Sequence, residues 1–309
     1  MSTAVEELEQ IAQTLGPLRH PKKFAIELCA ECNLNCAMCH HNTMVRPKGV
    51  MPLSLFKRLA DQIAEHAPKT ELWISFCGEP LLEPERLLEV LRYAREVGLK
   101  NVNLNTNGML LTPEWAGQII DTGLKLVVFG IDGFSKEVFE SFRMLADRDT
   151  VYANAEHFLK RRDAIGNGGP EVQVQFIYMD GNEHEFKPLR DHWLARGAVV
   201  KARRQLSWGG KLDTMLNVPK DKRIPCPWAL TMMHVFWDGR VPRCPGDTEG
   251  DEGFGNAWED SIIDLWAQLG VYRDKHLARQ FDELPESCQT CTDWMTGSAK
   301  RIKPEESVK

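Results

Sequence analysis

The sequence contains no long apolar run, no secretory signal and no large excess of charge. No stretch approaches the ~20 consecutive apolar residues of a membrane-spanning helix, and the first sixteen residues lack the basic and apolar regions of a signal peptide. A net charge of −6 gives no general attraction to nucleic acid. We therefore expect a cytoplasmic protein with neither a membrane nor a nucleic-acid partner.

The chain also has little need of cross-links. A chain of 309 residues can bury roughly three quarters of its unfolded surface, and an apolar fraction of 43% is ordinary for a globular protein. The nine cysteines are an odd number, and disulfides are rare in the reducing cytoplasm. Clustered cysteines there more often bind metal or carry out redox chemistry.

Short β-rich runs alternate with helical patterns over the first two thirds of the chain. The six runs that we expect to form strands are residues 23–28, 71–76, 101–106, 125–131, 171–179 and 198–206. This alternation predicts an α/β fold with right-handed βαβ units and a parallel sheet. Six units are too few for a closed eight-stranded barrel, so we expect a partial barrel or a doubly wound sheet. In both cases the chemistry belongs at the carboxyl ends of the strands.

The composition changes after residue 206, where Gly and Pro become frequent. We expect five segments along the chain. They are an N-terminal helix or tail (1–20), the strand–helix domain (21–207), a linker (208–225), a small cysteine-containing domain (226–300) and a disordered tail (301–309).

Four cysteines crowd the loop after the first expected strand. They are Cys29, Cys32, Cys36 and Cys39, and the last three form a C-x3-C-x2-C pattern. Three thiolates on a tight loop suit a cuboidal iron–sulfur cluster in which one iron remains free to chelate a small molecule. A zinc site is the alternative, with His40 or His41 as the fourth ligand.

Polar segments that contain glycine close the next four strands in turn. They are Phe76-Cys77-Gly78-Glu79-Pro80, Asn105-Thr106-Asn107-Gly108, Gly130-Ile131-Asp132-Gly133 and Asp180-Gly181-Asn182. An ordinary turn explains each segment by itself. Four of them in order, each closing a successive strand, are hard to assign to turns alone.

In this combination the chain resembles the radical S-adenosylmethionine (SAM) enzymes. The resemblance implies a partial (β/α)6, TIM-like barrel and a 4Fe–4S cluster held by Cys32, Cys36 and Cys39, whose open iron binds SAM. It also implies that reduction of the cluster releases a 5′-deoxyadenosyl radical, which removes a hydrogen atom from the substrate. The positions that match the family's SAM contacts are Met38, Gly78, Glu79, Pro80, Asn105, Asn107, Asp132 and Asn182. Met38 departs from the aromatic residue that is frequent there, and Gly130 stands where Ser is frequent.

A second group of cysteines lies near the C-terminus. Its members are Cys226, Cys244, Cys288 and Cys291. Four cysteines with a C-x2-C pair are also typical of structural zinc. Beside the first motif, however, the group resembles the SPASM extension of radical SAM enzymes in its shortened "twitch" form. This resemblance implies one auxiliary 4Fe–4S cluster with four protein ligands in a small C-terminal iron–sulfur domain.

The expected reaction is the oxidation of a carbinol carbon of a sugar or aminocyclitol to a ketone, with the auxiliary cluster as electron acceptor. Twitch-type aminocyclitol dehydrogenases are the relatives that suggest it. The first alternative is epimerisation with a cysteine thiol as hydrogen donor, for which Cys29 and Cys77 remain unassigned. Peptide maturation is a further alternative, less favoured because some twenty residues before the first strand leave no room for a leader-binding domain. The alternative outside enzymes is a zinc-binding scaffold.

Substrate contacts are expected after the sixth strand and in the C-terminal domain. The residues concerned are Arg203, Arg204, Gln205, Trp208, Trp228, His234 and Trp237. Ketone formation needs a proton acceptor, and the candidates are Glu185, His184, Arg203 and Lys201. The resemblance also implies a flavodoxin- or ferredoxin-type electron donor.

Overall fold

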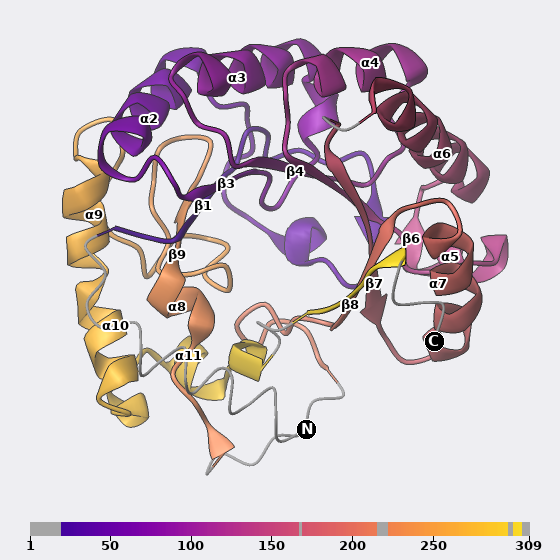
Figure 1. The fold of residues 1–309 in the computed structure, drawn as a ribbon. Coiled ribbons are helices and arrows are strands. Elements are labelled where there is room, and N and C mark those ends of the chain that lie inside the picture. Colours follow the sequence, from indigo (N-terminus) through magenta and orange to yellow (C-terminus); the bar gives the residue numbers. More distant parts are fainter. Residues whose placement is uncertain (1–19, 167–168, 215–221, 296–298, 305–309) are drawn as a thin grey trace.

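A sheet of eight strands curves through the molecule, and helices cover its outer face (Figure 1). The computed structural model describes residues 20–166, 169–214, 222–295 and 299–304. The strand order is β10-β8-β7-β5-β4-β3-β1-β9. Neighbouring strands are parallel except for β10, which is antiparallel to β8. The expected N-terminal helix or tail lies outside the described residues, except for residue 20.

Each of the six expected strands is present within its expected run. They are β1 (Lys23–Ile26), β3 (Glu71–Ile74), β4 (Val102–Thr106), β5 (Leu126–Gly130), β7 (Glu171–Tyr178) and β8 (Val199–Arg204). The helices between them are α2 (Leu53–His66), α3 (Pro84–Glu96), α4 (Pro113–Asp121), α5 (Lys136–Phe142), α6 (Arg148–Ile165) and α7 (Phe186–Leu194). Proline stands at the first position of α3 and of α4, where its missing N–H costs no hydrogen bond. The expected partial barrel is therefore confirmed.

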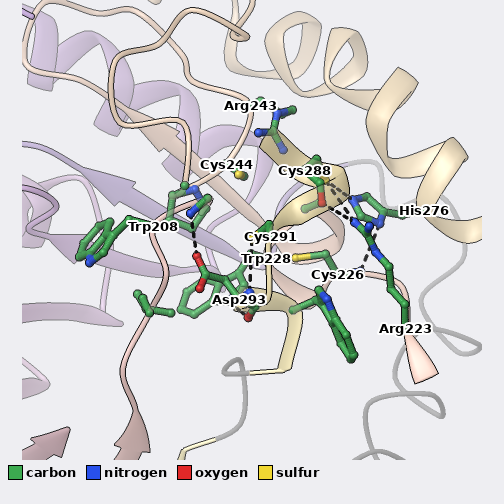
Figure 2. Close-up of a pocket in the computed structure, with 16 residues that line it drawn as sticks. Trp208, Arg223, Cys226, Trp228, Arg243, Cys244, His276, Cys288, Cys291 and Asp293 are labelled. Atoms are coloured by element: carbon green, nitrogen blue, oxygen red, sulfur yellow. Dashed lines mark hydrogen bonds between the residues drawn. The ribbon is translucent and has the colours of Figure 1, made fainter. Parts of the chain in front are cut away.

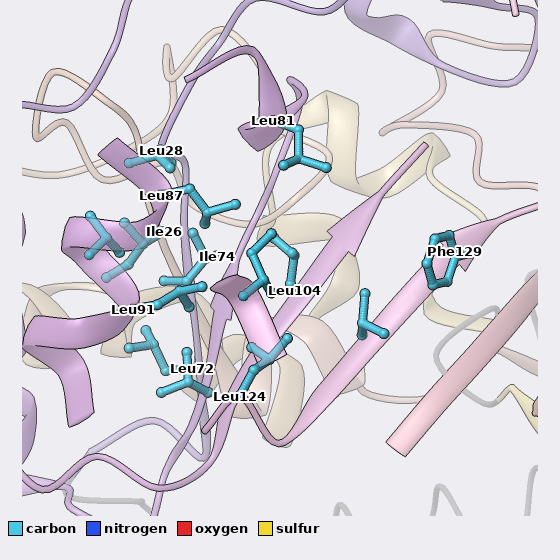
Figure 3. Packing of buried hydrophobic residues seen from close by; sticks show 14 of the residues in the cluster. Ile26, Leu28, Leu72, Ile74, Leu81, Leu87, Leu91, Leu104, Leu124 and Phe129 are labelled. Atoms are coloured by element: carbon cyan, nitrogen blue, oxygen red, sulfur yellow. The ribbon is translucent and has the colours of Figure 1, made fainter. Parts of the chain in front are cut away.

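The strands place apolar side chains outward and polar side chains inward, because successive residues of a strand point to opposite faces. Ile26, Ile74, Leu104 and Phe129 are fully buried in the layer between sheet and helices (Figure 3). Each such side chain contributes about 1.5–3 kcal/mol by leaving water. The alternate residues line the hollow of the barrel instead, so the core lies outside the sheet and the centre stays open to a ligand.

Two edge strands were not expected from the sequence. The strand β9 (Met232–Val235) pairs in parallel with β1, so the C-terminal part of the chain extends the sheet of the barrel. The strand β10 (Lys300–Ile302) pairs with β8, with Arg301 opposite Lys201. The expectation of a disordered tail over 301–309 is therefore wrong for residues 301 and 302, while residues 305–309 lie outside the described chain. Both strands are too short to show a clear period in the sequence.

The C-terminal helices flank the edge of the sheet at β9 (Figure 1). They are α8 (Pro227–Thr231), α9 (Ile262–Gln268), α10 (Gly270–Leu277) and α11 (Glu286–Thr290). Short elements elsewhere are β2 (Asn35–Cys36), β6 (Arg143–Met144), η1 (His40–Thr43), η2 (Pro80–Leu82), η3 (Glu183–Glu185), η5 (Phe281–Glu283) and η6 (Asp293–Met295). Helix α9 belongs to the same hydrophobic core as the barrel through Ile262, Leu265 and Trp266. In the part of the chain that the structure describes, no helix has the length and apolarity to cross a membrane.

Candidate active site

The first cysteine group follows β1 on a loop that returns to the barrel through β2. Cys36 lies in β2 and pairs with Arg143 of β6. Burial raises the pKa of the Cys32 and Cys36 thiols to about 11, and the neighbouring thiols add to the rise. The backbone N–H groups of Leu34 and His41 donate toward Cys32 and Cys39. Three close thiols with N–H donors fit a thiolate-ligated iron–sulfur cluster.

One guanidinium group approaches these sulfur atoms, and sequence reasoning missed it. Arg143 Nη1 lies 3.9 Å from Cys36 Sγ, and Nη2 pairs with Asp132 Oδ2 at 2.6 Å. Gly130 makes room for this pair, because a Cβ there would lie 2.2 Å from Arg143 Nη2. The glycine that departs from the family pattern was the one signal of Arg143 in the sequence.

Glu79 ties the ends of β3 and β4 together beside the cysteine loop. Its carboxylate accepts from Leu81 N at 3.0 Å, Thr106 Oγ1 at 2.9 Å and Asn107 N at 2.7 Å. Burial raises the pKa of Glu79, and these donors oppose the rise. Gly78 is required by a close approach, since a Cβ there would lie 2.0 Å from the carbonyl oxygen of Cys29. The polar strand ends thus hold the cysteine loop as well as facing the cofactor region.

Four further residues are expected to contact SAM. Met38 packs with Ile177 and Met179 in a small apolar cluster, and Asn105 lines the central cavity of the barrel. Asn107 Nδ2 lies 4.0 Å from Cys32 Sγ, and Pro80 is buried where η2 begins. These positions face the first cysteine group or the barrel centre.

Asp132 and Asn182 are engaged by protein groups. Asp132 is fully buried, with its carboxylate bound to Arg143 and to Ile177 N. Asn182 is also fully buried, and its amide donates to the carbonyl oxygens of Asp132 and Ile177. Both side chains therefore fix the loop after β7, and their contact with SAM stays a prediction.

Cys29 and Cys77 are buried and lie beside the first cysteine group. Burial raises the pKa of Cys29 to about 11. The pKa of Cys77 is raised by burial, by Glu27 and by Cys39. Among the described residues, the lining of the central cavity includes neither thiol. Both thiols are therefore set back from the surface of that cavity.

A buried ion pair, also unexpected, joins the cysteine loop to the C-terminal part of the chain. Arg46 pairs with Glu27, donates to Thr248 O at 2.7 Å and lies over the ring of Phe236 at 4.1 Å. Glu27 in turn accepts from Trp237 N at 3.3 Å. These residues are far apart in the sequence and belong to no motif, so no signal there could have found them.

The second cysteine group surrounds one cavity (Figure 2). Cys226 precedes α8, Cys288 lies on α11, Cys291 follows it, and Cys244 comes from the loop after β9; all four line the same space. Burial and the neighbouring thiols raise the pKa of Cys226 to about 12. Within the described ranges, no three His, Cys, Asp or Glu side chains converge as they would on a single metal ion.

Nitrogen donors surround this second group (Figure 2). Arg223 Nη2 lies 3.5 Å from Cys288 Sγ, and His276 Nε2 lies 3.7 Å from the same sulfur. Asp293 N donates to Cys291 Sγ at 3.3 Å, and Arg243 lines the same cavity. Four thiols around one space with such donors fit a fully ligated iron–sulfur cluster, because hydrogen bonds to the sulfurs are a usual part of such sites.

The hollow of the barrel is a cavity of about 670 Å³, within the range of small-molecule sites. Its lining shares Leu206, Trp208, Trp228 and Pro245 with the cavity of the second cysteine group. Trp208 holds a left-handed backbone conformation with φ of 52°, unusual for a bulky residue. Its Nε1 donates to Met38 O at 2.9 Å. One layer of side chains therefore separates the barrel centre from the second cysteine group.

The expected substrate residues are only partly brought together. Arg203, Trp208, Trp228, His234 and Lys201 line the central cavity. Arg204 is exposed, while Gln205 and Trp237 are half-buried; the described lining includes none of these three.

Two expected proton acceptors lie elsewhere. Glu185 Oε2 accepts from the backbone N–H groups of Phe134 and Ser135 at the start of α5. His184 is exposed and points toward Glu185. Glu185 thus fixes a loop, and neither residue belongs to the described lining of the central cavity.

Comparison with known families agrees with this geometry. The Radical SAM superfamily model matches residues 26–179, and the SPASM model, an iron–sulfur cluster-binding domain, matches residues 226–292. The chain therefore belongs to the radical SAM superfamily and carries a SPASM domain. Its cofactors are SAM, a 4Fe–4S cluster and auxiliary iron–sulfur chemistry in the SPASM domain, and membership sets aside the zinc scaffold.

Related proteins act on diverse substrates. The chain is 25% identical, over 88% of its length and 87% of the relative, to a tungsten-containing aldehyde ferredoxin oxidoreductase cofactor-modifying protein of Pyrococcus furiosus. It is 36% identical to the AdoMet-dependent heme synthase of Methanosarcina barkeri over 40% of this chain, but spans only 34% of that relative.

Solved structures show the same fold at low sequence identity. BtrN in complex with AdoMet and 2-DOIA has a TM-score of 0.60 and 18% identity, covering 88% of this chain and 92% of that one. Streptococcus suis SuiB bound to the precursor peptide SuiA has a TM-score of 0.68 and 13% identity, covering 94% and 74%.

Proposed function

We propose that this radical SAM enzyme oxidises a carbinol carbon of a hydroxylated small molecule, such as a sugar or aminocyclitol, to a ketone. The observation that carries the proposal is the wall of Leu206, Trp208, Trp228 and Pro245, which the two cavities share. A substrate in the barrel lies one side chain away from the second cysteine group. This proximity supports the second group as the acceptor of the electron that a substrate radical gives up.

The lining of the barrel suits a polar, hydroxylated substrate. Asn103, Asn105 and Gln175 present amides that can donate to and accept from hydroxyl groups, and Trp73 offers an indole face on which a sugar ring can pack. Bound SAM and the reduced first cluster supply the radical that removes a hydrogen atom. The resulting α-hydroxy carbon radical then becomes a ketone by losing the proton of its hydroxyl group and one electron. Lys201 and Arg203 are the two expected proton acceptors that line the cavity.

Epimerisation is less well supported. It needs a hydrogen donor on the face of the substrate opposite SAM, and Cys29 and Cys77 are buried beside the first cysteine group instead. Oxidation requires an electron acceptor, which the second group provides. The position of the cysteines therefore favours oxidation.

The test is an anaerobic assay against a panel of sugars, aminocyclitols and peptides in heavy water. We expect 5′-deoxyadenosine with hydrogen taken from the substrate, and a carbonyl product. Solvent deuterium at the product carbon would instead establish epimerisation, and a modified peptide would establish maturation. The matched variant Cys288→Ala should keep SAM cleavage and lose the ketone, because it removes a ligand of the second group only.

A further inference from the structure

Several charged residues at the lower end of the barrel, where the strands begin, already have polar or charged partners. Lys23 Nζ lies 3.2 Å from Glu71 Oε2, and Arg301 pairs with Glu171. Lys125 Nζ donates to Asn101 Oδ1 at 2.8 Å. Both carboxylates of the cavity lining, Glu71 and Glu171, are thereby engaged.

Lys201 and Arg203 differ from these cations. They lie two residues apart on β8, and both line the cavity. Among the described residues, neither forms an ion pair, and Arg203 Nε is buried without a hydrogen-bond partner. On the opposite wall, His234 Nδ1 is also buried without a partner. Within the described chain, the centre of the barrel thus holds two cations that have no carboxylate at ion-pair distance, while Asp132, Asp293 and Glu71 act on them from farther away.

The surroundings of Lys201 make the absence of a nearby countercharge energetically unfavourable. Its register partner on β10 is Arg301, and like charges directly opposite each other destabilise a sheet. Burial lowers the pKa of Lys201 to about 7, with Arg203, Lys23 and Arg301 adding to the fall and Glu71 opposing it. Lys201 is half-buried, and a cation that is partly removed from water without a partner is unfavourable. An anion at this point would remove that penalty.

We propose that the substrate is anionic and that its carboxylate or phosphate group binds between Lys201 and Arg203. This inference rests on the proposed function, because it names the substrate class for the same cavity. Trp73 lies 5.8 Å from Lys201 Nζ and flanks this position, so a ring attached to the anionic group would pack on the indole. The inference favours an acidic or phosphorylated sugar as the substrate. It disfavours a cationic aminocyclitol.

The test measures binding without turnover. Holoenzyme with SAM and no reductant is titrated anaerobically by calorimetry with glucose 6-phosphate, glucuronate, glucose and glucosamine. We expect at least one of the two acids to bind at least tenfold more tightly than glucose or glucosamine, because a charge-assisted hydrogen bond is worth roughly a factor of ten or more. The preferred acid distinguishes phosphate from carboxylate.

Three variants test the role of Lys201. Lys201→Gln should weaken binding of the preferred acid roughly tenfold or more, whereas Lys201→Arg should stay within about threefold because it keeps the charge. The control Lys125→Gln removes a cation of the same lining that is already bonded to Asn101. It should leave binding unchanged.

Several results would overturn the inference. They are equal binding of acids and glucose, no binding of either acid, or wild-type affinity in Lys201→Gln. Loss of ketone formation in Lys201→Arg, with hydrogen abstraction kept, would make Lys201 the proton acceptor instead.

The inference and the oxidation proposal can fail separately. If the acids bind through Lys201 but the reduced enzyme yields no ketone, the anion site is supported and the proposed oxidation is contradicted. If glucosamine is oxidised and Lys201→Gln has no effect, the oxidation stands and the anion site falls.

Discussion

The two cysteine groups present the same ligand chemistry in different electrostatic surroundings. At the first group, Arg143 is neutralised by Asp132, Arg203 acts on Cys39, and the carboxylate of Glu79 acts on Cys32 and Cys36. At the second group, Arg223 donates directly to Cys288 Sγ. Arg243 also acts on the second group, although it is itself paired with Glu252.

The difference indicates a division of labour. Hydrogen bonds to sulfur and nearby positive charge stabilise the reduced, more negative state of a cluster and raise its reduction potential. Nearby carboxylates have the opposite effect. This contrast agrees with the proposed function, in which the first group gives an electron to SAM and the second accepts one from the substrate.

The largest expected effect is the difference in activity between a variant of the first cysteine group and a variant of the second. Cys32→Ala should abolish 5′-deoxyadenosine formation, because the first cluster loses one of only three ligands. Cys226→Ala should keep it and lose the oxidised product. Chromatography measures both, and iron analysis should fall from about eight per chain to about four in each variant. Equal loss of SAM cleavage in both variants would remove the functional distinction.

The ion pair of Arg46 with Glu27 joins the cysteine loop to the C-terminal part of the chain, and a substitution of Arg46 breaks it. Arg46→Met leaves Glu27 buried without its partner and should lower the free energy of unfolding by about 3–5 kcal/mol. Denaturant titration measures this loss. The double variant Glu27→Gln/Arg46→Met should recover part of it, because no charge then remains buried. A loss below about 1 kcal/mol would show that the ion pair does not hold the two regions together.

The electrostatic contrast can be measured directly. Arg223→Gln should lower the reduction potential of the second cluster by on the order of 50 mV, a tenfold change for a one-electron couple. Redox titration followed by electron paramagnetic resonance gives the value. Arg190→Gln is the control, since Arg190 lies at the surface beside Asp191. An unchanged or higher potential in Arg223→Gln contradicts the proposed tuning.

The smallest expected effect is the pH dependence of anion binding in the central cavity. The pKa of Lys201 is lowered to about 7, so its ammonium form is present below that pH and lost above it. Anion affinity should therefore fall several-fold from about pH 6.5 to pH 8.5, since the charged amine binds the anion.

Lys201→Arg isolates the group that titrates. Arg203, Lys23, Arg301 and Glu71 also act on Lys201, and the Lys201→Arg variant leaves all four in place. The variant should therefore bind the anion with little pH dependence. A similar fall in affinity in Lys201→Arg would assign the titration to the ligand or to another residue.

The sequence predicted the parts of this molecule that depend on local patterns. The six central strands were found because each run carries its own β signal, and Cys32, Cys36 and Cys39 were found by spacing. The hydrogen bonds that Asn182 and Glu185 form with buried backbone groups were not predicted, because nothing local in the sequence shows them. The ion pair of Arg46 with Glu27 was invisible for a similar reason.

By itself, the sequence determined the sheet and the thiols, because strand period and ligand spacing are properties of neighbouring residues. Only the tertiary structure decided which polar groups are satisfied. Packing pairs Arg143 with Asp132 and leaves Lys201 facing Arg301. The physical reason is that a charge in a low-dielectric interior depends on partners brought in from distant strands, so its state is fixed only when the chain has folded.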